Sequence, residues 1–203
     1  VERQDTLKEA KITSDKITRV TKSQTGHRHL NKLDFIYGNV VFSSPDIIKS
    51  LQNLPGVSAG TELMSGLCVH GGEGSDNLFL IDGVPMYQIS HLGGMFSSFN
   101  TDVVSGLDFY KSGFPARYGG RMSSVVDVST KDGDFYNYHG SFMIGLIDGR
   151  LQFEGPIVKG KTSFNIALRR SWMDAVLAPT IAYLNKKNKD GEVIGGNYAF
   201  HDL

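Results

Sequence analysis

Residues 78–85 read Leu-Phe-Leu-Ile-Asp-Gly-Val-Pro and combine two structural signals. Residues 78–81 form a continuous apolar run, which is typical of a strand buried on both faces. Asp82-Gly83 follows at once, and Asp-Gly between apolar segments favours a two-residue β-hairpin. The stretch therefore predicts a central buried strand whose chain turns back at Asp82.

A short helix is predicted upstream of this strand. Ser44 could cap the helix, Pro45 suits the first helical position, and Asp46 suits the positive end of the helix dipole. The apolar residues of 47–54 recur at helical spacing, and Pro55-Gly56 ends the pattern. A strand is expected to begin immediately afterwards.

Turns and strands alternate along the rest of the first 130 residues. Glycine-rich turns are predicted at 71–77 and 111–121, a helix or turn followed by a strand at 102–110, and a strand at 124–128. Residues 87–100 are predicted to form an exposed loop. Short strands joined by many turns are expected to form a small mixed sheet.

Taken in order, four motifs within residues 43–130 resemble the plug domain of TonB-dependent outer-membrane receptors. They are Leu-Pro-Gly-Val at 54–57, the stretch 78–85, the segment from Leu107 to Arg121, and Ser-Ser-Val-Val-Asp-Val at 123–128. The likeness continues at 151–157 and 159–164, which resemble the first strands and turn of the family's barrel. It covers about three quarters of the chain.

The pattern of residues 138–203 agrees with the barrel. Phe142, Ile144 and Leu146 are apolar at even positions, and the parity flips from Ile147, which predicts a turn or a bulge near 145–149. A tight turn is predicted at 155–161, and alternation then resumes. Such strands are typical of a transmembrane barrel with lipid outside and a polar lumen. A sheet half-buried on a soluble core has the same periodicity, so the resemblance alone favours the barrel.

The expected fold class is an α+β plug, with a small mixed sheet, short helices and long loops, followed by the start of an antiparallel transmembrane β-barrel. We expect a flexible lead-in at 1–32, the plug at 33–132 and the first barrel strands at 138–203. Residues 173–197 are predicted to be a long extracellular loop. Trp172 would lie at the membrane interface or in ordinary packing.

Composition excludes several classes of protein. The 203 residues carry a formal net charge of zero, which disfavours nucleic-acid binding. No phosphate loop, nucleophile elbow or zinc-binding helix is present, so we expect no enzyme and assign no catalytic residue or cofactor. His27 and His29 lack the further ligands of a metal site, and the single cysteine, Cys68, is expected to be a small apolar residue.

The resemblance implies a function at the outer membrane. The plug would lie in the barrel lumen with the N-terminus in the periplasm and would gate energy-coupled uptake of an iron chelate, cobalamin, oligosaccharide or peptide. The implied partners are a TonB-type coupling protein, the remainder of the barrel and outer-membrane lipid. A surface lipoprotein would join them if the chain belongs to the SusC/RagA-like branch. Both ends are expected to be internal to a longer chain.

Two sets of site residues follow from the resemblance. Lys111, Arg117 and Arg121 are predicted to pair with the barrel wall, with exposed turn residues as the alternative. The predicted substrate-side loop contains Met86, Tyr87, His91 and Phe96. The alternative function for the whole chain is a soluble glycine-rich α/β binding or adhesion module.

Overall fold

A computed structural model describes residues 26–36, 40–41, 44–61, 64–91, 94–187 and 198–202. In chain order the elements are β1 (His27–Asn31), α2 (Lys32–Ile36), β2 (Val40–Val41), β3 (Ser44–Pro45), α3 (Ile47–Gln52), β4 (Val57–Thr61), β5 (Met64–Val69), η1 (Gly74–Asp76), β6 (Asn77–Ile81), β7 (Val84–Pro85), β8 (Ser90–His91), β9 (Phe96–Ser97), β10 (Val104–Tyr110), β11 (Ser124–Thr130), β12 (His139–Ile144), β13 (Asp148–Val158), β14 (Thr162–Ser171), α4 (Met173–Lys187) and β15 (His201–Asp202). No helix among these residues is long and apolar enough to cross a membrane.

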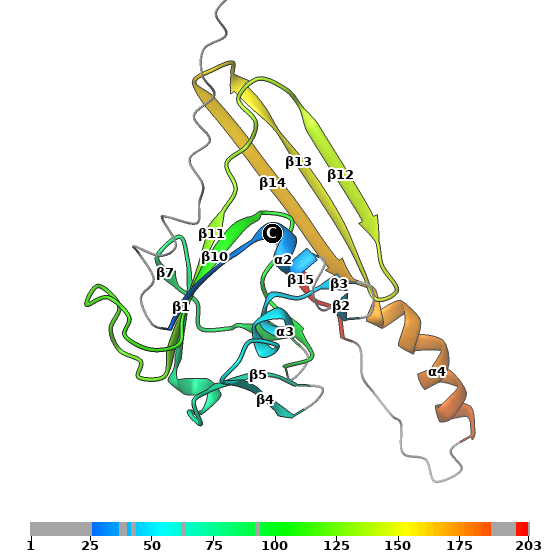
Figure 1. Cartoon of the computed structure of the whole chain (residues 1–203). Coiled ribbons are helices and arrows are strands. Elements are labelled where there is room, and N and C mark those ends of the chain that lie inside the picture. The colour runs from blue at the N-terminus through cyan, green and yellow to red at the C-terminus, as the bar shows by residue number, and fades with distance from the viewer. Residues whose placement is uncertain are drawn as a thin grey trace, which may run out of the picture.

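The first 130 residues build a mixed five-stranded sheet in the order β1-β10-β11-β6-β7 (Figure 1). β6 and β11 pair in parallel, and the other pairs are antiparallel. The predicted central strand is confirmed as β6. Its hairpin is confirmed as well, because Asp82 and Gly83 have φ of 48° and 79°, as a type I′ turn requires.

One apolar core fills the space between this sheet and the short helices. It includes Phe35 of α2, Ile47, Ile48 and Leu51 of α3, and Phe109 of β10, all fully buried. The predicted apolar face of the helix is therefore confirmed, but its predicted cap is wrong. Asp46 is the N-cap and accepts from the Lys49 amide, whereas Ser44 and Pro45 pair with β2.

β1 extends the sheet beyond the predicted plug boundary. Its register with β10 runs from His27 opposite Tyr110 to Asn31 opposite Gly106. His27 Nε2 and His29 Nδ1 both lie 2.9 Å from the same Asp108 oxygen. These two bonds help to lower the pKa of Asp108, although partial burial acts in the opposite direction. β1 was not predicted, because its sequence is polar and its only buried apolar side chain is Leu30.

The second sheet has the order β12-β13-β14-β15 and consists of antiparallel pairs. β12, β13 and β14 are long strands that reach past the plug in Figure 1. The predicted turn near 145–149 is confirmed between β12 and β13. The second turn is shorter than predicted, because β13 continues to Val158.

Close packing of aromatic rings over glycines shapes this sheet. A Cβ at Gly155 would collide with the Tyr138 ring, and one at Gly149 would collide with the indole of Trp172. The indole nitrogen of Trp172 donates to the Leu146 carbonyl at 3.2 Å. Trp172 therefore directly follows the last residue of β14 and packs beside the turn between β12 and β13.

Candidate functional site: the polar seam between plug and wall

We call the second sheet, β12–β15, the wall. Its strands β13 and β14 reverse the arrangement of a sheet in a soluble protein, which buries its apolar face. On β13, Asp148, Arg150, Gln152 and Glu154 are buried against the first domain. The alternate residues Leu151 and Phe153 point outward and are 58% and 49% exposed. Phe142, Ile144 and Ile166 on β12 and β14 are 78%, 76% and 55% exposed. On β13 and β14 the polar face is thus covered by protein and the apolar face is largely uncovered by the described residues, whereas β12 is exposed on both faces.

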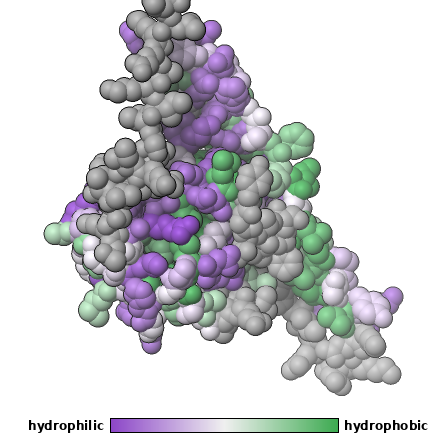
Figure 2. All heavy atoms as spheres, viewed as in Figure 1, coloured by the Kyte–Doolittle hydropathy of each residue, from purple (hydrophilic) through white to green (hydrophobic). Residues whose placement is uncertain are grey.

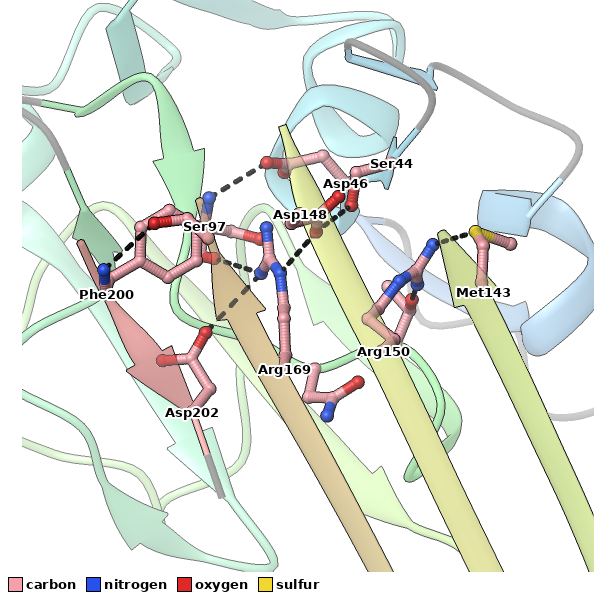
Figure 3. Close-up of polar contacts among 12 residues, drawn as sticks. Ser44, Asp46, Ser97, Met143, Asp148, Arg150, Arg169, Phe200 and Asp202 are labelled. Atoms are coloured by element: carbon pink, nitrogen blue, oxygen red, sulfur yellow. Dashed lines mark hydrogen bonds and ion pairs between the residues drawn. The ribbon is translucent and has the colours of Figure 1, made fainter. Parts of the chain in front are cut away.

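We call the contact between the inward face of β13–β15 and residues 44–46, 91, 96–102 and 131 the seam. Its centre is Arg169 of β14, whose side chain is 3% exposed. Nε donates to Asp148 Oδ2 at 2.9 Å, and Nη1 donates to the Ser97 carbonyl at 2.9 Å. The guanidinium also lies over the Phe200 ring, 5.0 Å from its centroid. Figure 3 shows Arg169 reaching from the wall towards Ser97.

Residues directly before α3 complete this centre. Ser44 Oγ donates to Asp148 Oδ2 at 3.0 Å across the seam. Asp46 accepts from the Ser97 amide at 2.9 Å, so both backbone groups of Ser97 are bonded, one within its own domain and one to the wall. The α3 cap thereby fixes the segment that Arg169 binds.

β15 and the preceding Phe200 form the end of the seam that lies beside His91. Asp202 Oδ1 lies 2.7 Å from His91 Nε2, and Asp202 Oδ2 lies 3.6 Å from Arg169 Nη1. His91 stacks on Phe200 with centroids 4.4 Å apart, and Phe96 packs on the same ring at 5.7 Å. The loop that carries His91 and Phe96 is therefore attached to the wall.

Two further contacts extend the seam along β13. Arg150 donates to Thr101 Oγ1 at 2.7 Å and lies 3.6 Å from Asp102. Glu154 pairs with Lys131 Nζ at 2.6 Å. Lys32 donates to the Asp102 carbonyl nearby, and burial lowers the pKa of its amine. Asp148, Arg150 and Glu154 of β13 thus bind three different segments of the plug, whereas Gln152 bonds within the wall.

The seam is not fully satisfied. Ser97 Oγ, Asn100 Nδ2 and Glu154 Oε2 are buried and have no hydrogen-bond partner among the described residues. A polar contact that leaves buried groups unpaired is weaker than an apolar interface of the same size. The seam can therefore hold the two parts in register without the cohesion of a hydrophobic core.

Comparison with protein families identifies the first domain. Residues 42–126 match the family model described as the TonB-dependent receptor plug domain.

Residues 42–126 are a TonB-dependent receptor plug domain.

Solved receptors contain the same arrangement of plug and wall. The siderophore receptor PirA from Acinetobacter baumannii superposes with a TM-score of 0.55 at 19% identity, over 79% of this chain and 26% of that one. The outer membrane transporter YddB from Escherichia coli gives 0.51 at 15%, over 72% and 26%. The ferric enterobactin receptor PfeA from Pseudomonas aeruginosa gives 0.52 at 18%, over 74% and 25%. The chain thus spans about a quarter of the length of these receptors, and comparison with curated proteins finds no match.

Two of the three predicted plug–wall cations bond within the plug. Lys111 Nζ donates to the Pro55 carbonyl at 2.8 Å, and Arg117 donates to the Tyr118 hydroxyl at 2.6 Å. Arg121 is exposed. Lys111 and Arg117 line separate surface cavities of about 500 and 400 Å³. Their pairing with the remainder of the barrel stays a prediction.

The four residues of the predicted substrate-side loop separate in the structure. Tyr87 is 89% exposed, whereas Met86 packs on the plug core. His91 and Phe96 belong to the seam, and residues 94–100 are largely buried, so the prediction of an exposed loop over 87–100 is wrong for its second half. The buried side chains of Phe96 and Phe99 pack this second half against the protein.

Sequence reasoning missed Arg169, Asp148 and Asp202, the centre of the seam. Their signal was present as charged residues at alternate positions of apolar strands, which a membrane barrel directs to its lumen. Among the described residues, no group of three or more His, Cys, Asp or Glu side chains could hold a metal ion.

Proposed function

We propose that the parent protein is a TonB-dependent outer-membrane transporter in which the plug gates uptake of a bulky nutrient. The observation that carries this proposal is the reversed burial of β13 and β14, with charged residues against the plug and apolar residues outward. Exposed Phe142, Ile144 and Leu151 would destabilise a soluble module, but they suit a strand face in contact with lipid.

The seam supplies the physical basis of a gate. Its contacts are hydrogen bonds and ion pairs that can exchange with water, so the plug can be displaced without exposing an apolar interface. Ligand binding on the outer side would bias the plug between two arrangements, and a TonB-type protein would supply work through a segment near the N-terminus. Residues 1–25 lie outside the described residues.

The nutrient is proposed only by class. The similar solved structures include siderophore receptors and a ferric enterobactin receptor. An iron chelate is therefore the first probe, with cobalamin, an oligosaccharide and a peptide beside it. The outer-membrane lipid and the rest of the barrel are the expected neighbours of the wall. A surface lipoprotein stays a prediction from the SusC/RagA-like resemblance.

The test uses the parent protein in cells with and without the coupling protein. We expect it in the outer-membrane fraction, and we expect accumulation of one labelled probe that stops when the coupling protein is deleted or the proton gradient is collapsed. Recovery of the parent protein in the soluble fraction would refute the transporter. Accumulation that continues unchanged without the coupling protein would refute the gate.

A further inference from the structure

α4 begins directly after β14 and carries a wide apolar face. At 100° per residue, Met173, Val176, Leu177, Ile181, Tyr183 and Leu184 fall on one arc of about 160°. The opposite arc holds alanines 175, 178 and 182 with Asn185 and Lys186. The apolar arc also holds Thr180, and the other side includes Asp174. The helix therefore has one largely apolar side and one side that is small or polar.

This apolar side is largely uncovered by the described residues. Val176 and Tyr183 are 56% and 66% exposed, and Leu177 and Leu184 are 37% and 43% exposed. Large apolar side chains grouped in this way on a surface mark a contact with a partner or a membrane. The sequence predicted a solvated loop here, so the apolar face needs a separate explanation.

The apolar face of α4 continues the outward face of the wall. Figure 2 shows apolar side chains following one another from the wall strands down along α4. Trp172 stands between the two, packed on Gly149 and bonded to the Leu146 carbonyl. Tryptophan is enriched at the boundary between lipid and water, so its position marks the rim of the wall.

The length of the connection limits where α4 can lie. The Trp172 carbonyl accepts from the amides of Ala175 and Val176, so the helix starts at the rim without a linker. Leu177 lies five residues beyond Trp172, which is about 7.5 Å of helix at 1.5 Å per residue. Interfacial helices bury their apolar side about 5–10 Å into the headgroup boundary. A helix that starts at the rim with so short a connection can reach the headgroup layer with its first turns.

We propose that α4 is an interfacial helix that rests its apolar arc on the outer leaflet of the membrane beside the barrel rim. The inference rests on the proposed function, because it needs β12–β14 to face lipid. Tyr183, on the apolar arc, suits this layer, since it combines an apolar body with a polar end. A lipid contact would fix the start of the loop that joins β14 to β15, and thereby the strand that binds His91.

The test places single nitroxide labels in the parent receptor, reconstituted in phosphatidylethanolamine and phosphatidylglycerol vesicles. The labelled variants are Leu177→Cys and Leu184→Cys on the apolar arc, Ala182→Cys on the opposite arc, and Leu151→Cys on β13. All carry Cys68→Ser in a background without other cysteines. Collisions with oxygen, which enters lipid, are compared with collisions with a water-soluble nickel chelate.

We expect oxygen to dominate at 151, 177 and 184 and nickel to dominate at 182. Nickel dominance at 177 and 184 with oxygen dominance at 151 would overturn the inference and leave the transporter intact. Labels at 177 and 184 that neither relaxant reaches would also overturn it, because protein would then cover the arc. Nickel dominance at 151 would remove the lipid-facing wall, and with it both the proposed function and this inference.

Discussion

At the scale of single residues, Arg169 and Arg170 show how one strand sorts identical side chains into different roles. Arg169 points inward, is 3% exposed and binds groups on both sides of the seam. Arg170 points outward, is 58% exposed and has an ion pair of 3.7 Å with Asp174. Burial decides the difference, because removing one partner of a buried pair leaves an uncompensated charge, whereas exposed pairs contribute little.

Arg169→Ala is expected to destabilise the assembled receptor by about 3 kcal/mol, because Asp148 stays buried without its cation. Arg170→Ala is the matched control and should cost less than about 0.5 kcal/mol. Thermal unfolding of the purified parent protein measures both. Equal losses for the two variants would show that Arg169 does not hold the seam.

The Asp82 turn depends on its side chain as well as its backbone. Its carboxylate accepts from the Thr130 amide at 2.9 Å and from the Thr130 hydroxyl at 2.6 Å. Asp82→Ala removes both bonds and places alanine at φ 48°, so we expect a loss of about 1–2 kcal/mol. Asp82→Asn keeps an acceptor and tolerates this φ, and should lose less. Denaturant unfolding ranks the variants, and an order with asparagine below alanine would contradict the role of the turn.

Asp134 lies in the connection between plug and wall. Backbone amides of Tyr136 and Asn137 donate to its carboxylate and lower its pKa from 3.8 to about 2. A carboxyl whose folded pKa is lowered stabilises the fold above the unfolded value and loses this effect as pH falls through the folded value. The stability difference between wild type and Asp134→Asn should therefore be full above pH about 4 and vanish towards pH about 2. Melting temperatures across this range measure it, and a difference independent of pH would contradict the bonds.

At the scale of elements, patterns of side-chain period predicted most strands correctly. The apolar run of β6 and the β-branched run of β11 were sufficient to predict these two strands, because both strands are buried in the plug sheet. β1 and α4 were missed for opposite reasons. β1 is polar and joins the sheet through backbone pairing, while α4 contains Pro179 and ends in lysines, which resembled a loop. Asp46 caps α3 in place of the predicted Ser44, whose hydroxyl instead donates to Asp148 across the seam.

The outward face of β14 gives a direct test of the wall. Ile166→Arg would place a charge among lipid chains, which costs about 2–4 kcal/mol near the centre of a bilayer. Ile166→Phe keeps the face apolar and should assemble normally. The readout is the fraction of parent receptor that shows heat-modifiable migration after extraction from the outer membrane. Normal assembly of the arginine variant would mean that this face does not meet lipid.

At the scale of the whole molecule, the plug and the wall bury opposite kinds of side chain. The members of both apolar clusters of buried residues lie between Leu30 and Val128, within the plug. The wall buries mainly charged and polar side chains, and its apolar residues lie outside. Periodicity predicted that one wall face is polar and the other apolar. It could not predict which face is covered, because that depends on whether water or lipid surrounds the molecule.

This division predicts that the plug folds alone and the wall does not. A piece spanning residues 26–132 keeps its apolar core and loses only seam contacts, so we expect a cooperative thermal transition and a monomer in analytical ultracentrifugation. A piece spanning residues 133–203 exposes an apolar face, has open strand edges and loses every plug partner of Arg169 and Glu154, so it should aggregate in water. Detergent micelles should reduce this aggregation, because they cover the apolar face, and should leave the plug piece unchanged. A plug piece without a cooperative transition would mean that the wall supplies part of its stability, and the seam would then be a structural interface rather than a separable one.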